Sequence, residues 1–110
     1  MIKTLLLSLL LVLSLPTEAE AGYGARPGKW CGWWMRKEMG VSDPRYNLAR
    51  SWYKYGRSTS PQIGSIVVWP HHVGIIVGKN QKGQWLVKSG NDGGKVKTRV
   101  WNLRGAKFRI

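Results

Sequence analysis

The amino-acid sequence predicts an α+β domain in which N-terminal helices pack on a small antiparallel sheet of about five strands. Two observations support this prediction. The region from Trp30 to Gly56 carries helix start and stop signals. The region after Gly64 contains short apolar or alternating runs separated by turn residues. Because the helices precede all of the strands, the strands are most simply antiparallel.

The N-terminal segment 1–21 reads as a secretory signal peptide. Lys3 supplies a positive start, an apolar run spans Leu5 to Leu15, and Ala19 and Ala21 are small residues at the spacing a signal peptidase reads. The run is shorter than the roughly 20 apolar residues of a membrane span, although an uncleaved anchor is the alternative. We therefore expect a secreted protein, periplasmic or extracellular, with a flexible lead-in over 22–29 and a single domain over 30–110.

Two helices are expected first in this domain. The segment Trp30–Met39 contains no proline and is followed by Gly40, a residue typical of the position just past a helix end. Asp43 followed by Pro44 is a start signal for a second helix. The residues that would form its buried stripe recur at i, i+4 and i+7: Leu48, Trp52 and Tyr55.

Five short strands are expected after Gly64, separated by turns at Lys79–Gly83 and Ser89–Gly94. They are Ser65–Trp69, His72–Gly78, Gln84–Lys88, Lys95–Trp101 and Lys107–Ile110.

The charge of the chain is strongly positive. The whole sequence carries a formal net charge of +13, and Lys3, Glu18 and Glu20 are its only charged residues before position 22. Such a surface favours anionic polymers, which for an exported protein include cell-wall polymers, lipopolysaccharide and membrane surfaces. We expect the protein to be a monomer. Nucleic acid is not expected, because no nucleic-acid-binding motif is present. A basic protein whose charge has no specific role is the alternative.

Cys31 is the single cysteine of the chain. It cannot form an internal disulfide, so it is inert packing, an intermolecular link or a nucleophile. The free N–H groups and the dipole of the first helical turn favour an anion, and we therefore expect the pKa of this thiol to be lowered.

His72 and Asn91 are expected to meet at one end of a hairpin. If Gly78 pairs with Trp85, His72 lies opposite Asn91, and a turn one residue shorter leaves Asn91 one step away. His71 should then point to the opposite face and be solvated, and a plain turn residue is the alternative interpretation of Asn91.

These residues suggest nucleophilic chemistry. A Cys31 thiolate would attack an acyl carbon, His72 would move the proton, and Asn91 would fix the imidazole tautomer. A metal site formed by Cys31, His71, His72 and Asp92 is not expected, because adjacent histidines point apart and the spacing fits no common zinc site. We expect no metal and no other cofactor.

Four segments in this order resemble the small papain-like cysteine peptidases of the CHAP and NlpC type. They are WCGWWMRKEMG, LARSWYKYG, PxxGSIVVW followed by HVGIIVG, and SGN. The resemblance covers roughly residues 30–100. It implies a papain-like fold that hydrolyses amide bonds in peptidoglycan, with Cys31 as nucleophile, His72 as base and Asn91 as the orienting group. The chain departs from the family pattern at Ser65, where Asp is common, and at Trp69, where Phe is common, and its link before His72 is short.

Trp30, Trp34 and Trp69 are candidate substrate-binding residues, with core packing as the alternative. Trp33 and Trp34 are adjacent on the predicted helix and cannot both face the sheet. The sequence thus predicts a secreted cysteine peptidase or amidase that cleaves stem peptides or the muramoyl–alanine bond. The alternatives are a cationic wall- or membrane-binding protein without turnover, and a secreted antibacterial effector with the same chemistry.

Overall fold

The computed structural model describes residues 22–110, so the predicted signal peptide over 1–21 lies outside the described residues. The helical elements are the α-helix α3 (Cys31–Met39) and two 3-10 helices, η1 (Pro44–Asn47) and η2 (Ala49–Lys54). The strands are β1 (Ile66–Trp69), β2 (His72–Lys79), β3 (Trp85–Asp92), β4 (Lys95–Val100) and β5 (Lys107–Arg109).

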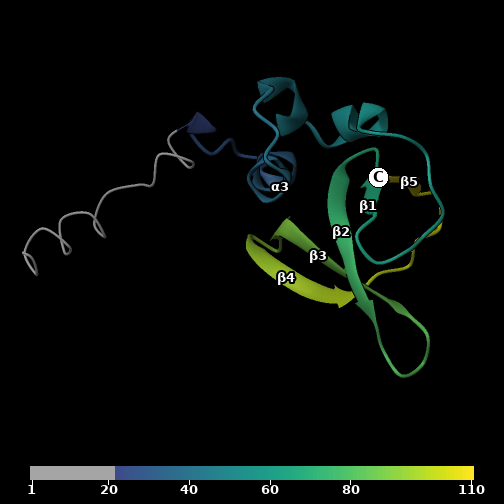
Figure 1. Cartoon of the computed structure of the whole chain (residues 1–110). Helices are drawn as coiled ribbons and strands as arrows, with labels where there is room; N and C mark the ends of the chain where they lie inside the picture. The colour runs from purple at the N-terminus through teal and green to yellow at the C-terminus, as the bar shows by residue number, and fades with distance from the viewer. Residues whose placement is uncertain (1–21) are drawn as a thin grey trace, which may run out of the picture.

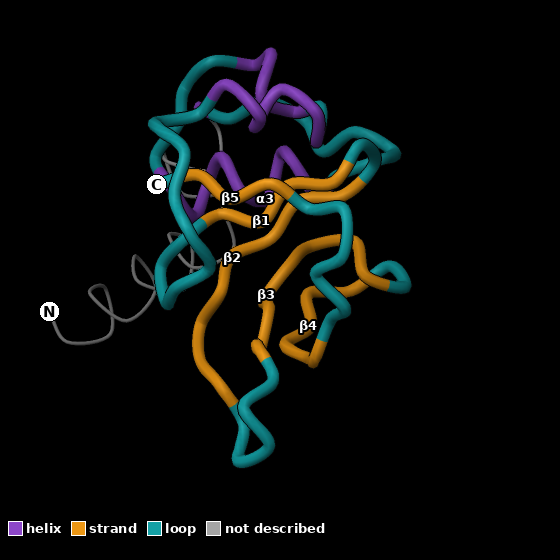
Figure 2. Tube along the Cα trace, turned by 90° about the vertical axis from the view of Figure 1, so that its right-hand side faces the viewer, coloured by secondary structure: helices purple, strands orange, loops and turns teal. Residues whose placement is uncertain are grey.

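The architecture is the predicted α+β arrangement, with an N-terminal helix and 3-10 turns packed on a five-stranded antiparallel sheet. The strand order is β4-β3-β2-β1-β5 (Figure 1). The helical segments gather at one end of the sheet, while the tip of the β2–β3 hairpin extends from the other end (Figure 2). Among residues 22–110, no helix is long and apolar enough to cross a membrane.

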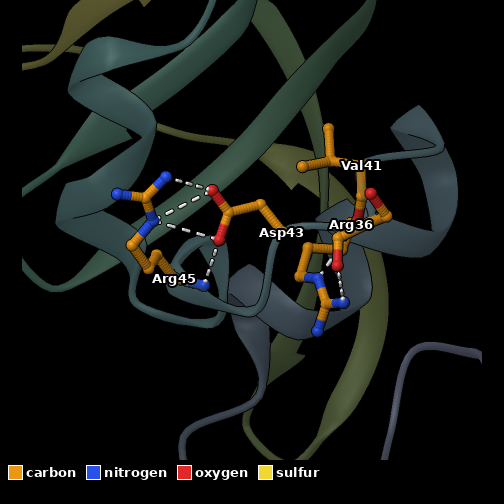
Figure 3. Close-up of polar contacts among 5 residues, drawn as sticks. Arg36, Val41, Asp43 and Arg45 are labelled. Carbon is orange, nitrogen blue, oxygen red and sulfur yellow. Dashed lines mark hydrogen bonds and ion pairs between the residues drawn. The ribbon is translucent and has the colours of Figure 1, made fainter.

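The first predicted helix is confirmed as α3, and it ends as expected. Gly40 adopts the left-handed conformation, with φ 68°, and its N–H donates to the Arg36 carbonyl. Arg36 itself is almost fully buried. Its guanidinium donates to the carbonyls of Val41 at 3.1 Å and Ser42 at 2.7 Å (Figure 3). It also donates to the carbonyl of Tyr23, and so ties the segment predicted as a flexible lead-in to α3.

The predicted second helix is wrong as a continuous element. Asp43 caps its start by accepting a hydrogen bond from the Arg45 N–H, as the sequence suggested, but the chain turns extended at Leu48 and divides the segment into η1 and η2. The Tyr46 carbonyl accepts the indole N–H of Trp52 at 2.8 Å, which ties η2 back to η1. Trp52 is fully buried, whereas Leu48, expected in the buried stripe, is 54% exposed.

The sheet carries a hydrophobic cluster on each face. The larger one lies under α3 and η2 and includes Met35, Trp52 and Val73. The smaller one has three buried members and is covered by half-buried aromatic residues. The three buried members are Val67, Ile76 and Val87.

The third strand is longer than the sequence predicted. Ser89–Asp92 was expected to be part of a loop but continues β3. The β2–β3 register shifts between Ile76 and Gly78, which is the signature of a bulge. Gly78 therefore pairs with Leu86 and not with Trp85.

Candidate active site

Cys31 is the first residue of α3 and only 5% exposed. Burial raises the pKa of its thiol, while backbone hydrogen bonding at Val73, and then at Gly32 and Cys31 itself, acts in the opposite direction. The expectation of a lowered thiol pKa is therefore wrong, because desolvation outweighs the favourable backbone groups of the helix start. The contribution of Val73 also locates the sulfur beside the first residues of β2.

Glycine at position 90 allows α3 to approach β3 closely. A Cβ atom there would lie 2.6 Å from Trp34 Cβ and 2.9 Å from Trp30 Cζ3, which is closer than real Cβ contacts. Trp34 of α3 and Trp30, which precedes the helix, therefore rest directly on the backbone next to Asn91. Close docking of this kind fixes the position of Cys31 relative to β2 and β3.

The imidazole of His72 is held by a serine. His72 Nε2 lies 2.9 Å from Ser89 Oγ on the neighbouring strand. Gly74 makes room for this contact, because a Cβ atom at position 74 would lie 3.0 Å from Ser89 Cβ and 2.6 Å from Val87 Cγ1. Among the described residues, no hydrogen bond is found at the other ring nitrogen of His72, Nδ1.

Aromatic rings flank the same imidazole. The ring of His72 stacks on Trp101, with centroids 4.8 Å apart and planes 18° apart, and the Trp69 ring lies 6.0 Å away. Burial lowers the pKa of His72, with a smaller opposing effect from Asp92 and a reinforcing one from Arg99. At neutral pH the imidazole is therefore neutral and able to accept a proton.

Asp92 and Arg99 form an ion pair next to this histidine. Arg99 Nε donates to Asp92 Oδ2 at 2.6 Å, and hydrogen bonding from Arg99 lowers the pKa of the Asp92 carboxyl. The carboxylate is thus ionised and mostly neutralised by its partner, so it contributes only a modest field at His72.

Asn91 has the only positive φ among the non-glycine residues described, at 54°. Ile75 pairs with Lys88 and Ile76 with Val87, a register that would place His72 opposite Asn91 if it continued to the strand ends. The observed pairs stop at Ile75, and Asn91 makes no side-chain hydrogen bond to any residue in the 22–110 region. Its orienting role remains a prediction.

A pocket of about 260 Å³ borders Cys31. His71, predicted to face away and to be solvated, is exposed as expected but lines this pocket from the tight turn between β1 and β2. Lys29, Arg50 and Pro70 also line it. The pocket therefore gives an approach to the start of α3 along a basic wall.

The three candidate substrate-binding tryptophans differ in exposure. Trp30 and Trp34 are 7% and 6% exposed and belong to the cluster beneath α3. Trp69 is half-buried on the other cluster, with its ring 5.0 Å from that of Trp101. Of the three, Trp69 leaves the most surface for a ligand, and a binding role for any of them remains a prediction.

The structure thus brings α3 against β2 and β3, and it places Cys31 beside Val73 and His72 beside Ser89. Cys31 belongs to the cluster beneath α3, whereas His72 packs beside Trp69 and Trp101 on the other face of the sheet. No hydrogen bond joins Cys31 and His72 within the described part of the chain, and their convergence in one cleft remains a prediction. In the same part of the chain, no group of three or more His, Cys, Asp or Glu side chains is arranged to hold a metal ion.

Sequence reasoning missed Ser89 and Trp101. Ser89 lies two residues before Asn91, and so on the same strand face in a regular strand, where a diagonal contact with His72 is within reach. That signal was present, but the segment was interpreted as a loop. Trp101 carried no comparable signal, because its position over His72 depends on how β4 runs into the C-terminal turn.

Comparisons with known proteins identify no relative of this chain. No family model, no curated protein and no solved structure matches the chain.

Proposed function

We propose that the protein is a secreted cysteine hydrolase, of papain-like fold, that cleaves amide bonds of peptidoglycan. The observation that carries the proposal is the position of Cys31 at the start of α3, where it borders a pocket of about 260 Å³ and packs in the same cluster as Val73, the second residue of β2. The close packing of α3 on Gly90, beside Asn91, supports it further. The resemblance to the CHAP and NlpC type implies a triad drawn from three separate segments. Cys31, His72 and Asn91 come from α3, β2 and β3, which pack against one another.

The protonation states favour general-base activation of the thiol. The pKa of Cys31 is raised and that of His72 is lowered, so the resting pair is a neutral thiol and a neutral imidazole. His72 accepts the thiol proton as sulfur bonds to the acyl carbon, and the carbonyl oxygen takes up the negative charge. The N–H of Cys31, in the first turn of α3, has no partner within the helix and is suited to stabilise that oxygen.

The second half of the reaction returns the proton. The C–N bond breaks, His72 protonates the leaving amine, and a thioester remains on Cys31. Water then attacks the thioester with His72 again accepting a proton, which releases a carboxylic acid and restores the thiol. Each step moves one proton and needs no cofactor.

Ser89 orients the base in this proposal. Its contact with Nε2 holds one side of the ring and leaves Nδ1 for the thiol proton. Asn91 keeps the role that the family resemblance implies, as a second group that fixes the ring in the complex with substrate. The Trp101 ring covers the histidine and restricts its exchange with bulk water.

Mass spectrometry of muropeptides after digestion of purified sacculi tests the proposal. We expect the wild type to release fragments cut at one type of amide bond, and the Cys31→Ala and His72→Ala variants to release none. His71→Ala is compared with His72→Ala, because His71 is the other imidazole and lines the pocket beside Cys31. Unchanged digestion by Cys31→Ala would refute the hydrolase, and loss of activity only in His71→Ala would move the base to that residue.

A second candidate function is attachment to anionic walls or membranes without turnover. The low exposure of the Cys31 sulfur favours it, because a nucleophile must reach its substrate. Under this function, all three variants bind sacculi as the wild type does and none releases fragments.

A further inference from the structure

A second, larger hollow continues from the Cys31 pocket. It has a volume of about 570 Å³ and shares Arg50 and Pro70 with the pocket beside Cys31. Two residues common to both linings make them neighbouring parts of one groove, which runs from the start of α3 along η1 and η2. We call this the η groove. It comprises the residues that line the larger hollow and Lys29 from the pocket beside Cys31.

The lining of the η groove is basic. Lys29 lines the pocket beside Cys31, Arg45 and Lys54 line the larger hollow, and Arg50 lines both. Asp43 is the one acid among the lining residues, and it is already engaged by Arg45 through hydrogen bonds of 2.7–3.2 Å (Figure 3). Across residues 22–110, no acidic side chain pairs with Arg50 or Lys54, so two positive charges face the groove without a partner.

The walls are also aromatic. Tyr46 and Tyr53 line the larger hollow and are only partly exposed. Tyrosine rings provide flat apolar surface for aliphatic and peptide groups, whereas Arg50 offers a fork of donors that matches a carboxylate. A groove with rings on its walls and cations at intervals fits a short peptide with free carboxylates better than a uniform polyphosphate, which needs only charge.

We propose that the η groove binds the carboxylate-bearing peptide portion of the substrate and that Arg50 determines this specificity. The inference rests on the proposed hydrolase, since it takes the scissile bond to lie at the Cys31 end. Arg50 lies in the lining of both hollows, so a carboxylate bound there is next to the acyl group that Cys31 would attack. Lys54 receives a second carboxylate farther along the peptide.

The test separates binding from turnover. Binding is measured by calorimetry on the Cys31→Ala variant, with a wall-derived stem tetrapeptide as probe and the same peptide with its carboxyl groups amidated as comparison. We expect the free peptide to bind at least about tenfold more tightly than the amidated one, because a charged hydrogen bond is lost on amidation. Adding Arg50→Gln should abolish this preference, and adding Lys54→Gln should reduce it.

Matched controls remove the same charge elsewhere. Arg104→Gln and Lys82→Gln change exposed residues that do not line the groove, and both should leave the preference intact. Equal effects of Arg50→Gln and Arg104→Gln would overturn the proposal and assign the binding to net charge. Tighter binding of a glycerol-phosphate oligomer that depends on Arg50 would overturn it in favour of a phosphate polymer.

The outcome for the groove is independent of the outcome for the enzyme. If Cys31→Ala still digests sacculi, the hydrolase proposal fails, whereas the peptide preference is read from calorimetry alone. If digestion depends on Cys31 but the Arg50→Gln variant keeps the preference for free carboxylates, the enzyme stands and the groove proposal fails. The circular dichroism spectrum and melting temperature of each variant establish that it is folded.

Discussion

The two faces of the sheet differ in how completely their side chains are buried. The face beneath α3 holds a dry cluster in which Trp52 and Met35 have no exposure and the Cys31 sulfur is almost enclosed. The opposite face has a cluster of only three buried hydrophobic residues, covered by partly exposed rings. On this face His72 contacts the hydroxyl of Ser89 and lies near the Asp92–Arg99 ion pair. Cys31 therefore lies on one face and His72 on the other, so the proton transfer of the proposed mechanism has to pass around the start of β2.

The largest expected effect is the loss of a core indole beneath α3. Trp52→Ala removes a fully buried side chain, together with its hydrogen bond to the Tyr46 carbonyl, and should lower the free energy of unfolding by about 3–5 kcal/mol. Trp101→Ala, on the opposite face, should cost only about 1 kcal/mol but should expose His72. Urea denaturation of both variants measures the difference, and equal losses would show that the two faces are not distinct.

The next effect comes from the contact between α3 and β3. Gly90→Ala adds a methyl group against Trp34 and Trp30 and should cost about 1–3 kcal/mol. Because α3 must move away from β3, we also expect a loss of hydrolysis larger than the loss of stability explains. Gly78→Ala is the matched control on the same sheet, since its added atom meets only Leu86 at an ordinary 3.8 Å. A folded, fully active Gly90→Ala variant would contradict the docking argument.

A smaller effect is expected at the serine that holds the imidazole. Ser89→Ala removes the partner of His72 Nε2, and we expect kcat/KM to fall about tenfold, which corresponds to the roughly 1.4 kcal/mol of one hydrogen bond. Ser89→Thr keeps the hydroxyl and should restore most of the activity. If Ser89→Ala is silent while Asn91→Ala is inactive, the orienting group is Asn91.

The smallest effect is a shift in pH dependence. Burial lowers the pKa of His72, and the base must be unprotonated, so the acid limb of kcat/KM should lie below the ordinary value of 6.5. Arg99→Gln removes a positive charge that lowers this pKa, and the limb should move toward higher pH. A limb at or above 6.5 in the wild type would contradict the buried environment of the imidazole.

The same titration affects stability in a definite direction. The unfolded chain binds a proton at His72 near 6.5, whereas the folded protein binds it only at lower pH. The unfolded state therefore holds more protons in that interval, and the free energy of unfolding should fall as the pH falls below 6.5. Thermal melts of the wild type and His72→Gln across this interval measure the contribution.

The elements with strong local signals were predictable from the sequence. The β-branched run at 65–69 and the alternating run at 95–101 are strands, and Gly40 marks the end of α3. The 44–55 segment was not predictable, because its apolar spacing matches a helix. Its actual course depends on Gly32, where a Cβ atom would collide with the Tyr46 and Asn47 carbonyls. Contacts between segments, and not propensity, divide it into two 3-10 helices.

The candidate site was predictable in part for the same reason. Strand alternation and hairpin register brought His72 near the residues of β3, but they could not choose between Ser89 and Asn91. The direction of the Cys31 pKa was missed because it depends on burial in the cluster that Cys31 shares with Val68 and Val73, which come from β1 and β2. A local rule for helix starts contains no information about that burial.

The enclosure of Cys31 has a consequence for the chemical lifetime of its thiol. The thiolate form of an accessible cysteine attacks peroxides and disulfides and is oxidised by them, and here Cys31 is both mostly covered and mostly protonated. Oxidation of Cys31 would therefore require α3 to separate from the sheet. The rate of thiol oxidation in an oxidising medium is then set by how often that local opening occurs.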